Sequence, residues 1–344
     1  MLRFLLRLVV LAILVVGAWL AWALLLPVRP GQPKFVLLRP GWSTKHIANE
    51  LQAQGVIRSA RAFLLYHYLA NPTTLKAGEY KFEAPASVRQ IHQRLVHGDI
   101  FVHTVVIPEG FNLFEIAAVI DGAGLGSKQE FLDAARAQTA LVSDIDPQAQ
   151  SLEGYLFPDT YGFTRTQTMS DIVSSMVRRF RQEAHGLSLN HDVHRVVTLA
   201  AIVEKETAVP EERPLVASVY QNRLNRGMAL DADPTVIYAA LLANRYTGTI
   251  HQSDLQSDSP YNTYKFPGLP PGPIANPGRA SLQAALQPAA TDYLYFVSDG
   301  NGHHRFARTL EEHSRNVSAY RRSRLEAVPS SGVHVGRLRR TAAR

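Results

Sequence analysis

A long uncharged segment near the N-terminus constrains this chain more than any other sequence feature. Residues Leu8–Leu26 are nearly all apolar, and together with Phe4–Leu6 they are long enough to cross a bilayer. Arg3 and Arg7 precede the segment, which predicts a cytoplasmic N-terminus and an outer location for the rest of the chain. A cleaved signal peptide is the main alternative, but its hydrophobic region would be shorter and would end at small residues. We therefore predict an uncleaved single-pass anchor.

The positive charge of the chain is concentrated at its two ends. Between residues 321 and 344, seven arginines stand against one glutamate, and two arginines precede the apolar segment, so the two ends carry +8 of a net charge of +7 and the rest of the chain carries −1. The body of the chain is close to neutral, which argues against a broad nucleic-acid footprint. The sequence has no cysteine, which excludes disulfides, thiolate metal sites and a cysteine nucleophile.

An internal repeat with an offset of 69 residues follows the anchor and a Pro/Gly linker at 28–34. Each copy predicts a strand, a turn and an amphipathic helix that ends at a glycine. The matching residues are Gly41, Trp42, Ile47, Ala48, Leu51, Gly55 and Val56 in the first copy and Gly110, Phe111, Ile116, Ala117, Ile120, Gly124 and Leu125 in the second. A strand near 78–82 and a helix at 87–97 lie between the copies. We expect a small α+β region of the LysM kind.

The segment from about residue 190 to Glu206 predicts a largely buried helix that ends in two carboxylates. Its apolar residues follow helical spacing on more than one face, Asn190 is a candidate cap, and Pro210 follows the helix end. The negative end of the helix dipole and burial both raise the pKa of a glutamate placed here. A general acid that works near neutral pH needs such a raised pKa.

The two carboxylates, Glu204 and Glu206, are expected to have different roles. At roughly 100° per residue they point about 200° apart, so one cleft can normally use only one of them. The other is expected to be a structural residue, with Lys205, Arg213 and Arg223 as available partners. Ion pairing of both glutamates remains the alternative from this segment alone.

Two further segments carry side chains that suit a sugar-binding cleft. Asp233 lies directly before a Pro-Thr pair, so it is either a helix cap or a cleft residue. Tyr261, Asn262 and Tyr264 precede a rigid proline- and glycine-rich loop at 267–278, and they supply flat apolar faces and hydrogen-bonding groups. Packing of this loop onto the body explains these residues equally well.

Other reaction classes have no signature in the sequence. A Gly-x-Ser-x-Gly elbow, a Walker loop and a dinucleotide fingerprint are all missing, which removes the common esterase, nucleotide and dehydrogenase functions. His304 and His313 could suggest a metal site, but no HExxH motif accompanies them. We predict neither a metal nor another cofactor, and acid catalysis by a carboxyl group is the chemistry that remains.

Several ordered motifs follow the anchor along most of the chain. They are LEGYLFPDTY (152–161), IVEKET (202–207), NRL (222–224), DPTVIY (233–238), YNTY (261–264), GLPPGPIANPG (268–278) and YFVSDGNGHHRF (295–306). In this combination the chain resembles the YceG-like family, the endolytic murein transglycosylases. The resemblance reaches to about Tyr320 and leaves the tail beyond Leu325 outside it. The second glutamate of the EKET motif is the catalytic one in that family, which implies a catalytic role for Glu206.

The resemblance implies a lyase that cuts the β-1,4 bond between N-acetylmuramic acid and N-acetylglucosamine in nascent peptidoglycan. Glu206 would protonate the glycosidic oxygen and then accept the proton of the C6 hydroxyl, so that a 1,6-anhydro end forms and water is not the nucleophile. It also implies work beside wall-synthesising enzymes at the inner (cytoplasmic) membrane, where the protein would terminate glycan elongation. Residues in the family motifs are expected to line the glycan cleft: Glu153, Asn222, Asp233, Tyr261, Asn262 and Tyr264.

Two other functions stay open from the residues. Hydrolysing glycosidases typically use a second carboxylate, and Glu153, Asp159 and Asp233 are candidates for it, so a muramidase-type hydrolase is one alternative. A membrane-tethered, non-catalytic scaffold that binds glycan is the other.

The expected fold is α+β. It comprises a cytoplasmic N-terminus and transmembrane helix (1–27), a linker (28–34), a LysM-like α+β region (35–150), an α+β catalytic domain with a lysozyme-like glutamate helix (151–325) and a disordered basic tail (326–344). The expected partners are peptidoglycan glycan strands and the membrane, and not nucleic acid.

Overall fold

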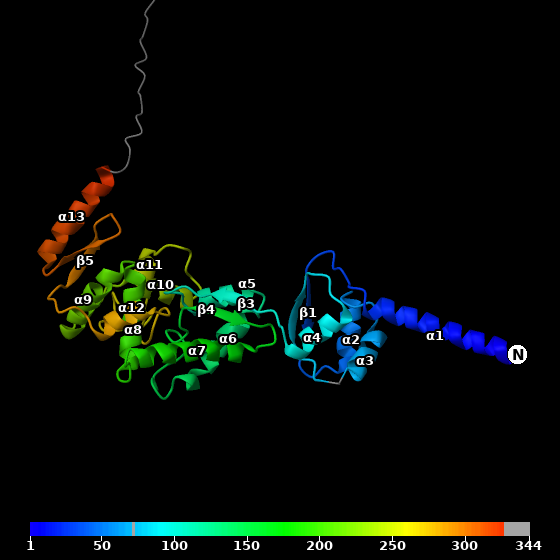
Figure 1. The fold of residues 1–344 in the computed structure, drawn as a ribbon. Coiled ribbons are helices and arrows are strands. Elements are labelled where there is room, and N and C mark those ends of the chain that lie inside the picture. The colour runs from blue at the N-terminus through cyan, green and yellow to red at the C-terminus, as the bar shows by residue number, and fades with distance from the viewer. Residues whose placement is uncertain (71–72, 327–344) are drawn as a thin grey trace, which may run out of the picture. The chain divides into compact units, whose positions relative to one another are not determined.

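The computed structural model describes residues 1–70 and 73–326 and has a mixed α+β fold (Figure 1). The chain forms two compact units. The first contains residues 1–144 and 150–181, and the second contains residues 145–149 and the chain from 182 onward. The predicted basic tail at 326–344 lies outside the described residues, apart from Glu326 at the end of the last helix.

The first unit begins with one long apolar helix and continues with short strands and helices. Its elements are α1 (Leu2–Leu24), β1 (Lys34–Leu38), α2 (Thr44–Ala53), α3 (Ala60–Leu69), β2 (Gly78–Phe82), α4 (Val88–His97), β3 (His103–Val106), α5 (Leu113–Gly122), α6 (Lys128–Ala137), the 3-10 turn η1 (Thr139–Leu141), β4 (Thr160–Phe163) and α7 (Met169–Gly186), whose end belongs to the second unit.

Helix α1 matches the apolar segment predicted from the sequence. Within the part of the chain that the structure describes, it is the one helix long and apolar enough to cross a membrane, and its most apolar stretch is exposed. It is therefore a membrane anchor or a signal sequence. Arg58 donates to the backbone carbonyls of Leu26 and Pro27, just after this helix, and its guanidinium lies over the ring of Trp22.

The internal repeat is confirmed as two copies of a βααβ arrangement. In the first, β1 pairs with β2 in antiparallel fashion, and in the second β3 pairs with β4 in the same way (Figure 1). Gly41 and Gly110 hold equivalent turns with φ of +82° and +77°, a conformation that favours glycine. The sequence predicted the first strand and first helix of each copy but missed the second helices, α3 and α6, and the closing strand β4. The second copy runs to Phe163.

The helix predicted between the copies is also confirmed. Ser87 forms a capping box with Gln90 at the start of α4, and Gly98 ends the helix with φ of +79°. Its apolar face joins the core of the first βααβ copy, which includes Phe63 and Tyr80. Both signals were local, so the sequence alone was sufficient to place this helix.

The second unit is built around the glutamate helix. Its elements are α8 (Val193–Glu206), the 3-10 turn η2 (Pro210–Glu212), α9 (Arg213–Asn225), α10 (Asp233–Leu242), α11 (Gln252–Leu255), α12 (Arg279–Leu286), β5 (Tyr295–Ser298), β6 (His304–Ala307) and α13 (Leu310–Glu326). Helix α8 packs against α9, α10 and α12, so it is buried on several sides as its apolar pattern predicts.

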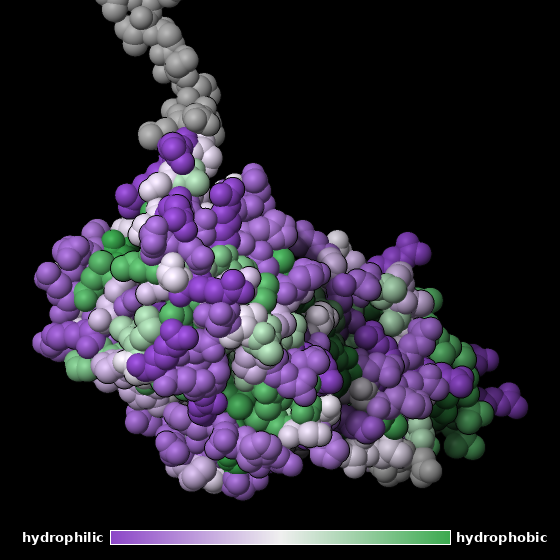
Figure 2. Space-filling view, turned by 90° about the vertical axis from the view of Figure 1, so that its left-hand side faces the viewer, coloured by the Kyte–Doolittle hydropathy of each residue, from purple (hydrophilic) through white to green (hydrophobic). Residues whose placement is uncertain are grey.

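The predicted cap of α8 was two residues too early. Asp192 occupies the cap position with φ of +51° and forms no side-chain cap, so the proposed cap at Asn190 is wrong. The predicted hairpin near the C-terminus is confirmed, with Phe296 of β5 opposite Phe306 of β6. Figure 2 views the side of the molecule that carries α13 and β5 and shows a mostly hydrophilic surface with smaller hydrophobic patches, as expected for a unit exposed to water.

Candidate active site

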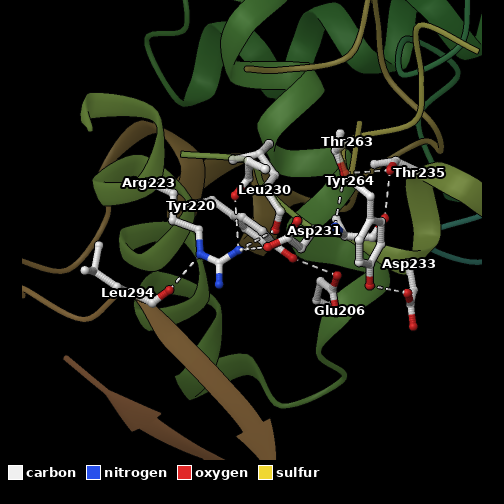
Figure 3. Close-up of polar contacts among 12 residues, drawn as sticks. Glu206, Tyr220, Arg223, Leu230, Asp231, Asp233, Thr235, Thr263, Tyr264 and Leu294 are labelled. Atoms are coloured by element: carbon white, nitrogen blue, oxygen red, sulfur yellow. Dashed lines mark hydrogen bonds and ion pairs between the residues drawn. The ribbon is translucent and has the colours of Figure 1, made fainter. Parts of the chain in front are cut away.

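A cavity of about 370 Å³ lies in the second unit where α8 ends. It combines carboxylates, one guanidinium and several aromatic rings, which is the mixture that a ligand with apolar and hydroxylated faces requires. Its lining residues are Glu206, Tyr220, Arg223, Leu230, Asp231, Asp233, Tyr264, Tyr295, Phe296, Leu310 and His313. Most of the polar ones are drawn in Figure 3.

Glu206 is the carboxyl group of this cavity whose titration is most perturbed. Burial raises its pKa from the ordinary 4.5 to about 7, and the nearby Asp233 carboxylate acts in the same direction. A hydrogen bond from Tyr220 and the charges of His304 and Arg223 oppose this change and limit it. Glu206 is thus partly protonated at neutral pH, as a general acid must be.

The hydrogen bond from Tyr220 also decides which oxygen carries the proton. The Tyr220 hydroxyl donates to Oε1 of Glu206 at 2.7 Å (Figure 3). Burial raises the pKa of Tyr220 well above its usual value, so this hydroxyl remains a donor at any physiological pH. Because Oε1 accepts that bond, the proton of the neutral carboxyl group sits on Oε2. No described residue bonds to Oε2, which leaves it available to a ligand.

Glu204 has a different environment, as the helical geometry predicted. Its Oε1 pairs with Nη2 of Arg213 at 2.9 Å, and its Oε2 accepts the backbone N–H of Gly278 at 2.9 Å. Arg213, one of three candidate partners, is therefore confirmed. Through these two bonds Glu204 connects α8 to the start of α9 and to the rigid loop before α12, which is a structural role.

Asp233 and Tyr264 meet at the mouth of the same cavity. The Tyr264 hydroxyl donates to Oδ1 of Asp233 at 2.6 Å (Figure 3). Asp233 begins α10 but the cap position is Ala232, so Asp233 is not the N-cap that its sequence context allowed. Its side chain is instead available to the cavity, and its negative charge is what helps to raise the pKa of Glu206.

A buried pair of threonines fixes the positions of Asp233 and Tyr264 relative to each other. Thr263 and Thr235 share a hydrogen bond of 2.9 Å between their hydroxyls, and Thr263 Oγ1 also accepts the backbone N–H of Ala232 at 3.1 Å. Both threonines are almost fully buried. The two motifs that contain Asp233 and Tyr264 are thus joined to each other one or two residues away from the side chains that line the cavity.

Comparison with known proteins now decides the family. The profile of the YceG-like family matches residues 36–319, which is most of the chain. The chain belongs to the YceG-like family. It is 35% identical over 306 residues to the endolytic murein transglycosylase of Bacillus subtilis, covering 83% of this chain and 84% of that protein. It is 30% identical over 357 residues to the endolytic murein transglycosylase of Streptococcus pneumoniae serotype 2, covering 92% of this chain and 65% of that protein.

The fold agrees with this assignment. A crystal structure of a YceG-like protein from Listeria monocytogenes superposes with a TM-score of 0.54 at 34% sequence identity. The match covers 83% of this chain and 99% of that one. The mixed α+β architecture is therefore that of the YceG-like family.

Other residues that the sequence singled out have their side chains engaged away from the cavity. Asn222 donates to the carbonyls of Thr291 and Tyr293, and buried Asn262 donates to the carbonyls of Leu255 and Ser257. These bonds hold loops of the second unit in place. Contact of either asparagine with a ligand remains a prediction.

Tyr261 and Glu153 also lie outside the cavity lining. The Tyr261 ring packs beside the Tyr238 ring at 5.1 Å between centroids. Glu153 belongs to the first unit, is buried, and accepts the backbone N–H of Leu113 at the start of α5. Asp159, another candidate second carboxylate, is in the first unit as well and pairs with Arg179 at 2.5 Å. Of the three candidates, the cavity contains Asp233.

The histidines near the C-terminus have partners other than a metal. His304 Nδ1 lies 2.7 Å from Oε2 of Glu212, and the His313 ring stacks on the Tyr295 ring. Among residues 1–70 and 73–326, no group of three or more His, Cys, Asp or Glu side chains is placed to hold a metal ion.

Sequence reasoning missed several cavity residues of this YceG-like protein. Tyr220 and Arg223 stand three positions apart on α9, so they share a face, but periodicity could not say that this face meets Glu206. For Arg223, its position beside Asn222 in the NRL motif was the available signal. Leu310 and His313 come from α13, and their approach depends on how the last hairpin returns the chain.

Proposed function

We propose that this chain is an endolytic peptidoglycan lytic transglycosylase that cleaves the β-1,4 bond between N-acetylmuramic acid and N-acetylglucosamine. The proposal rests on a single glutamate, Glu206, whose pKa is about 7. It lines a cavity that is large enough for a small ligand. The names of the Bacillus and Streptococcus relatives support peptidoglycan as the substrate and transglycosylation as the reaction.

The first step uses Glu206 as an acid. The proton on Oε2 passes to the glycosidic oxygen, the bond from that oxygen to C1 of the muramoyl unit breaks, and positive charge develops at C1 and its ring oxygen. The carboxylate of Asp233, oriented by the Tyr264 hydroxyl, stabilises this charge. The N-acetylglucosamine leaves with the proton.

The second step uses the same residue as a base. Glu206 is now a carboxylate and accepts the proton of the C6 hydroxyl while the C6 oxygen bonds to C1, which gives the 1,6-anhydro end. The hydroxyl of Tyr220 donates to Oε1 and stabilises the anionic form between the two steps. No water is consumed, and Glu206 ends the cycle with its proton restored.

The second carboxylate does not by itself favour hydrolysis. A general base for water needs an oxygen free to accept the proton of that water. Oδ1 of Asp233 already accepts the short hydrogen bond from Tyr264, so that oxygen is engaged by the protein. An electrostatic role for Asp233 therefore fits its contacts better than activation of water.

We assign the remaining cleft candidates according to their contacts. Asp233 and Tyr264 contact the glycan together with Glu206, whereas Asn222, Tyr261 and Asn262 shape the loops around it. Glu153 fixes the start of α5 in the first unit. We take residues 151–325 as the catalytic part and compare α8, a buried helix that ends in the catalytic glutamate, with the glutamate helix of lysozyme-like folds.

The first unit has a role in holding the glycan and in placing the enzyme. Its two βααβ copies, each with a two-stranded antiparallel sheet, support the comparison with LysM modules and hence glycan binding by the region predicted at 35–150, which the second copy extends to Phe163. Helix α1 supports a single-pass anchor in the inner membrane with the catalytic part outside. There the enzyme would end nascent glycan chains beside wall-synthesising enzymes.

Product analysis tests the proposed function. The full-length protein in detergent micelles is incubated with peptidoglycan, and the soluble products are identified by mass spectrometry. We expect muropeptides with 1,6-anhydro ends, which are lighter by one water than their reducing counterparts. Reducing muramic acid ends would identify a muramidase instead. Retention of glycan with no new chain ends would identify a scaffold.

A matched pair of variants assigns the activity to the cavity. Glu206→Gln removes the acid while keeping an acceptor for Tyr220, so we expect loss of product. Glu204→Gln makes the same substitution at the neighbouring structural carboxylate. The fraction of this variant that folds should still catalyse the reaction.

A further inference from the structure

Two of the three guanidinium nitrogens of Arg223, Nε and Nη1, donate hydrogen bonds to described residues, and the third, Nη2, does not. Nε donates to the carbonyl of Leu294 at 2.7 Å. Nη1 donates to the carbonyls of Ala229 and Leu230 at 3.1 and 3.0 Å and to Oδ2 of Asp231 at 3.0 Å. Among the described residues Nη2 has no partner, and it carries no dashed line in Figure 3.

This open edge belongs to the catalytic cavity. Arg223 is 9% exposed, and it is one of the residues that line the cavity with Glu206. It follows Tyr220 by three residues on α9, so the two side chains share one face of that helix. The charge of Arg223 also lowers the pKa of both Glu206 and His313, which places it within electrostatic reach of each.

A fixed guanidinium with two free N–H groups is a binding site for an oxygen acceptor. Burial removes most of the water that would otherwise satisfy these donors, so leaving them unpaired has a cost that a ligand can relieve. The plane is fixed by four hydrogen bonds and by the Tyr295 ring, 5.1 Å beneath it. Little side-chain entropy is then lost when a ligand binds.

The carboxylates of the cavity do not already fill this role. Asp231 bonds to Nη1 and not to Nη2. Asp233 accepts its hydrogen bond from Tyr264. The cavity therefore has one positively charged hydrogen-bond donor, Nη2 of Arg223, that is not paired with a carboxylate of the cavity. Arg223 lines the same cavity as the acid Glu206.

The group of peptidoglycan that fits this edge is the lactyl substituent of the muramoyl unit. It stands on C3 of the sugar whose C1–oxygen bond is cleaved. It adds a carboxyl-derived acceptor that N-acetylglucosamine, which has only its acetamido carbonyl, lacks.

We propose that Nη2 of Arg223 binds the carbonyl oxygen of the muramoyl lactyl group and so places the muramoyl unit, and not N-acetylglucosamine, on the C1 side of the bond next to Glu206. This inference rests on the proposed function, since it names a subsite of the same cavity. The oxygen is an amide carbonyl where a stem peptide is attached and a carboxylate where it has been removed. Either form offers the acceptor that the free edge requires.

Equilibrium binding to the Glu206→Gln protein tests the proposal without turnover. Three soluble oligosaccharides of equal length are compared by calorimetry: a peptide-bearing muramoyl oligomer, the same oligomer stripped of peptide, and a chitin oligomer that has no lactyl group. We expect the first two to bind within about threefold of each other, and the chitin oligomer to bind roughly ten- to hundred-fold more weakly, as for loss of a hydrogen bond to a charged group.

Variants then assign the discrimination to one side chain. Arg223→Lys keeps the charge but loses the planar fork, so the two muramoyl oligomers should fall to the affinity of the chitin oligomer. Arg226→Lys is the matched control, because Arg226 is exposed just after α9 and does not line the cavity. If Arg223→Lys does not fold, as judged by hydrogen exchange of α9, the three-ligand comparison decides alone.

Equal affinity for all three oligomers would overturn the proposal. So would strong binding of the peptide-bearing oligomer alone, because the site would then recognise the peptide and not the lactyl group. Failure of the proposed function is a separate result: wild-type protein would yield no anhydro ends, while the binding preference for lactyl-bearing oligomers would still establish the subsite.

Discussion

Replacing the catalytic acid should make the protein more stable, by an amount that grows as the pH rises from about 4.5 to about 7. Burial holds the pKa of Glu206 at about 7 in the folded state, against 4.5 for an unperturbed glutamate. Between these two values the unfolded chain has lost a proton that the folded chain keeps, so the stability of the second unit falls as the pH rises and stays lower above about 7.

The size of this effect follows from the same two pKa values. At about 1.4 kcal/mol per pH unit the full difference is about 3 kcal/mol. Glu206 is partly open to the cavity, so solvent reduces this difference and we expect about 2 kcal/mol. Glu206→Gln removes the ionisation and keeps the acceptor for Tyr220, so the variant should match wild type near pH 4.5 and exceed its stability by that amount at pH 8.

Hydrogen exchange measured by mass spectrometry on peptides from α8 is the suitable assay. All three tryptophans, Trp19, Trp22 and Trp42, lie in the first unit, so tryptophan fluorescence would not report on the second. Comparing variant and wild type at each pH cancels the pH dependence of intrinsic exchange. We expect α8 to exchange roughly thirty-fold more slowly in the variant at pH 8.

The control is Glu204→Gln, which breaks the pair with Arg213 and should lower the stability at every pH. Parallel stability curves for wild type and Glu206→Gln from pH 4.5 to 8 would refute the reasoning, because they would mean that Glu206 titrates as an ordinary exposed glutamate.

The neighbours of Glu206 give further tests. Tyr220→Phe removes a hydrogen bond that lowers the pKa of Glu206, so the alkaline limb of the kcat/KM profile should move up by about one pH unit while the rate falls. Asp233→Asn removes a charge that raises this pKa, so the limb should move to lower pH and kcat should fall. Ile202→Ala removes a fully buried side chain of α8 and leaves a cavity, so it should cost about 2–5 kcal/mol of stability by hydrogen exchange, with the limb unmoved.

The sequence predicted local features of the fold well and long-range ones poorly. The cap at Ser87, the glycine turns of the repeat and the apolar pattern of α8 are short-range signals, and all of them are present in the structure. Strand β4 pairs with β3, which lies more than 50 residues earlier in the chain. Tertiary packing determines this pairing, and the four residues of β4 alone do not.

The candidate site shows the same division. Helical geometry separated Glu204 from Glu206, and the ion pair of Glu204 with Arg213 agrees with it. The contact between Tyr220 and Glu206 joins two helices, so no periodicity within either one could predict it. Asn222 and Asn262 donate to backbone carbonyls, a structural need that the sequence does not display, and their contact with the glycan stays a prediction.

The pH dependence of the reaction tests most directly whether protonated Glu206 is the acid. The rate of release of 1,6-anhydro ends from peptidoglycan is measured from pH 5 to 9 with wild type and Glu206→Gln. We predict that kcat/KM falls above about pH 7, where Glu206 loses its proton, and that the variant releases no such ends. A wild-type profile that falls already near the ordinary glutamate pKa of 4.5, or a variant with wild-type activity, would contradict the account.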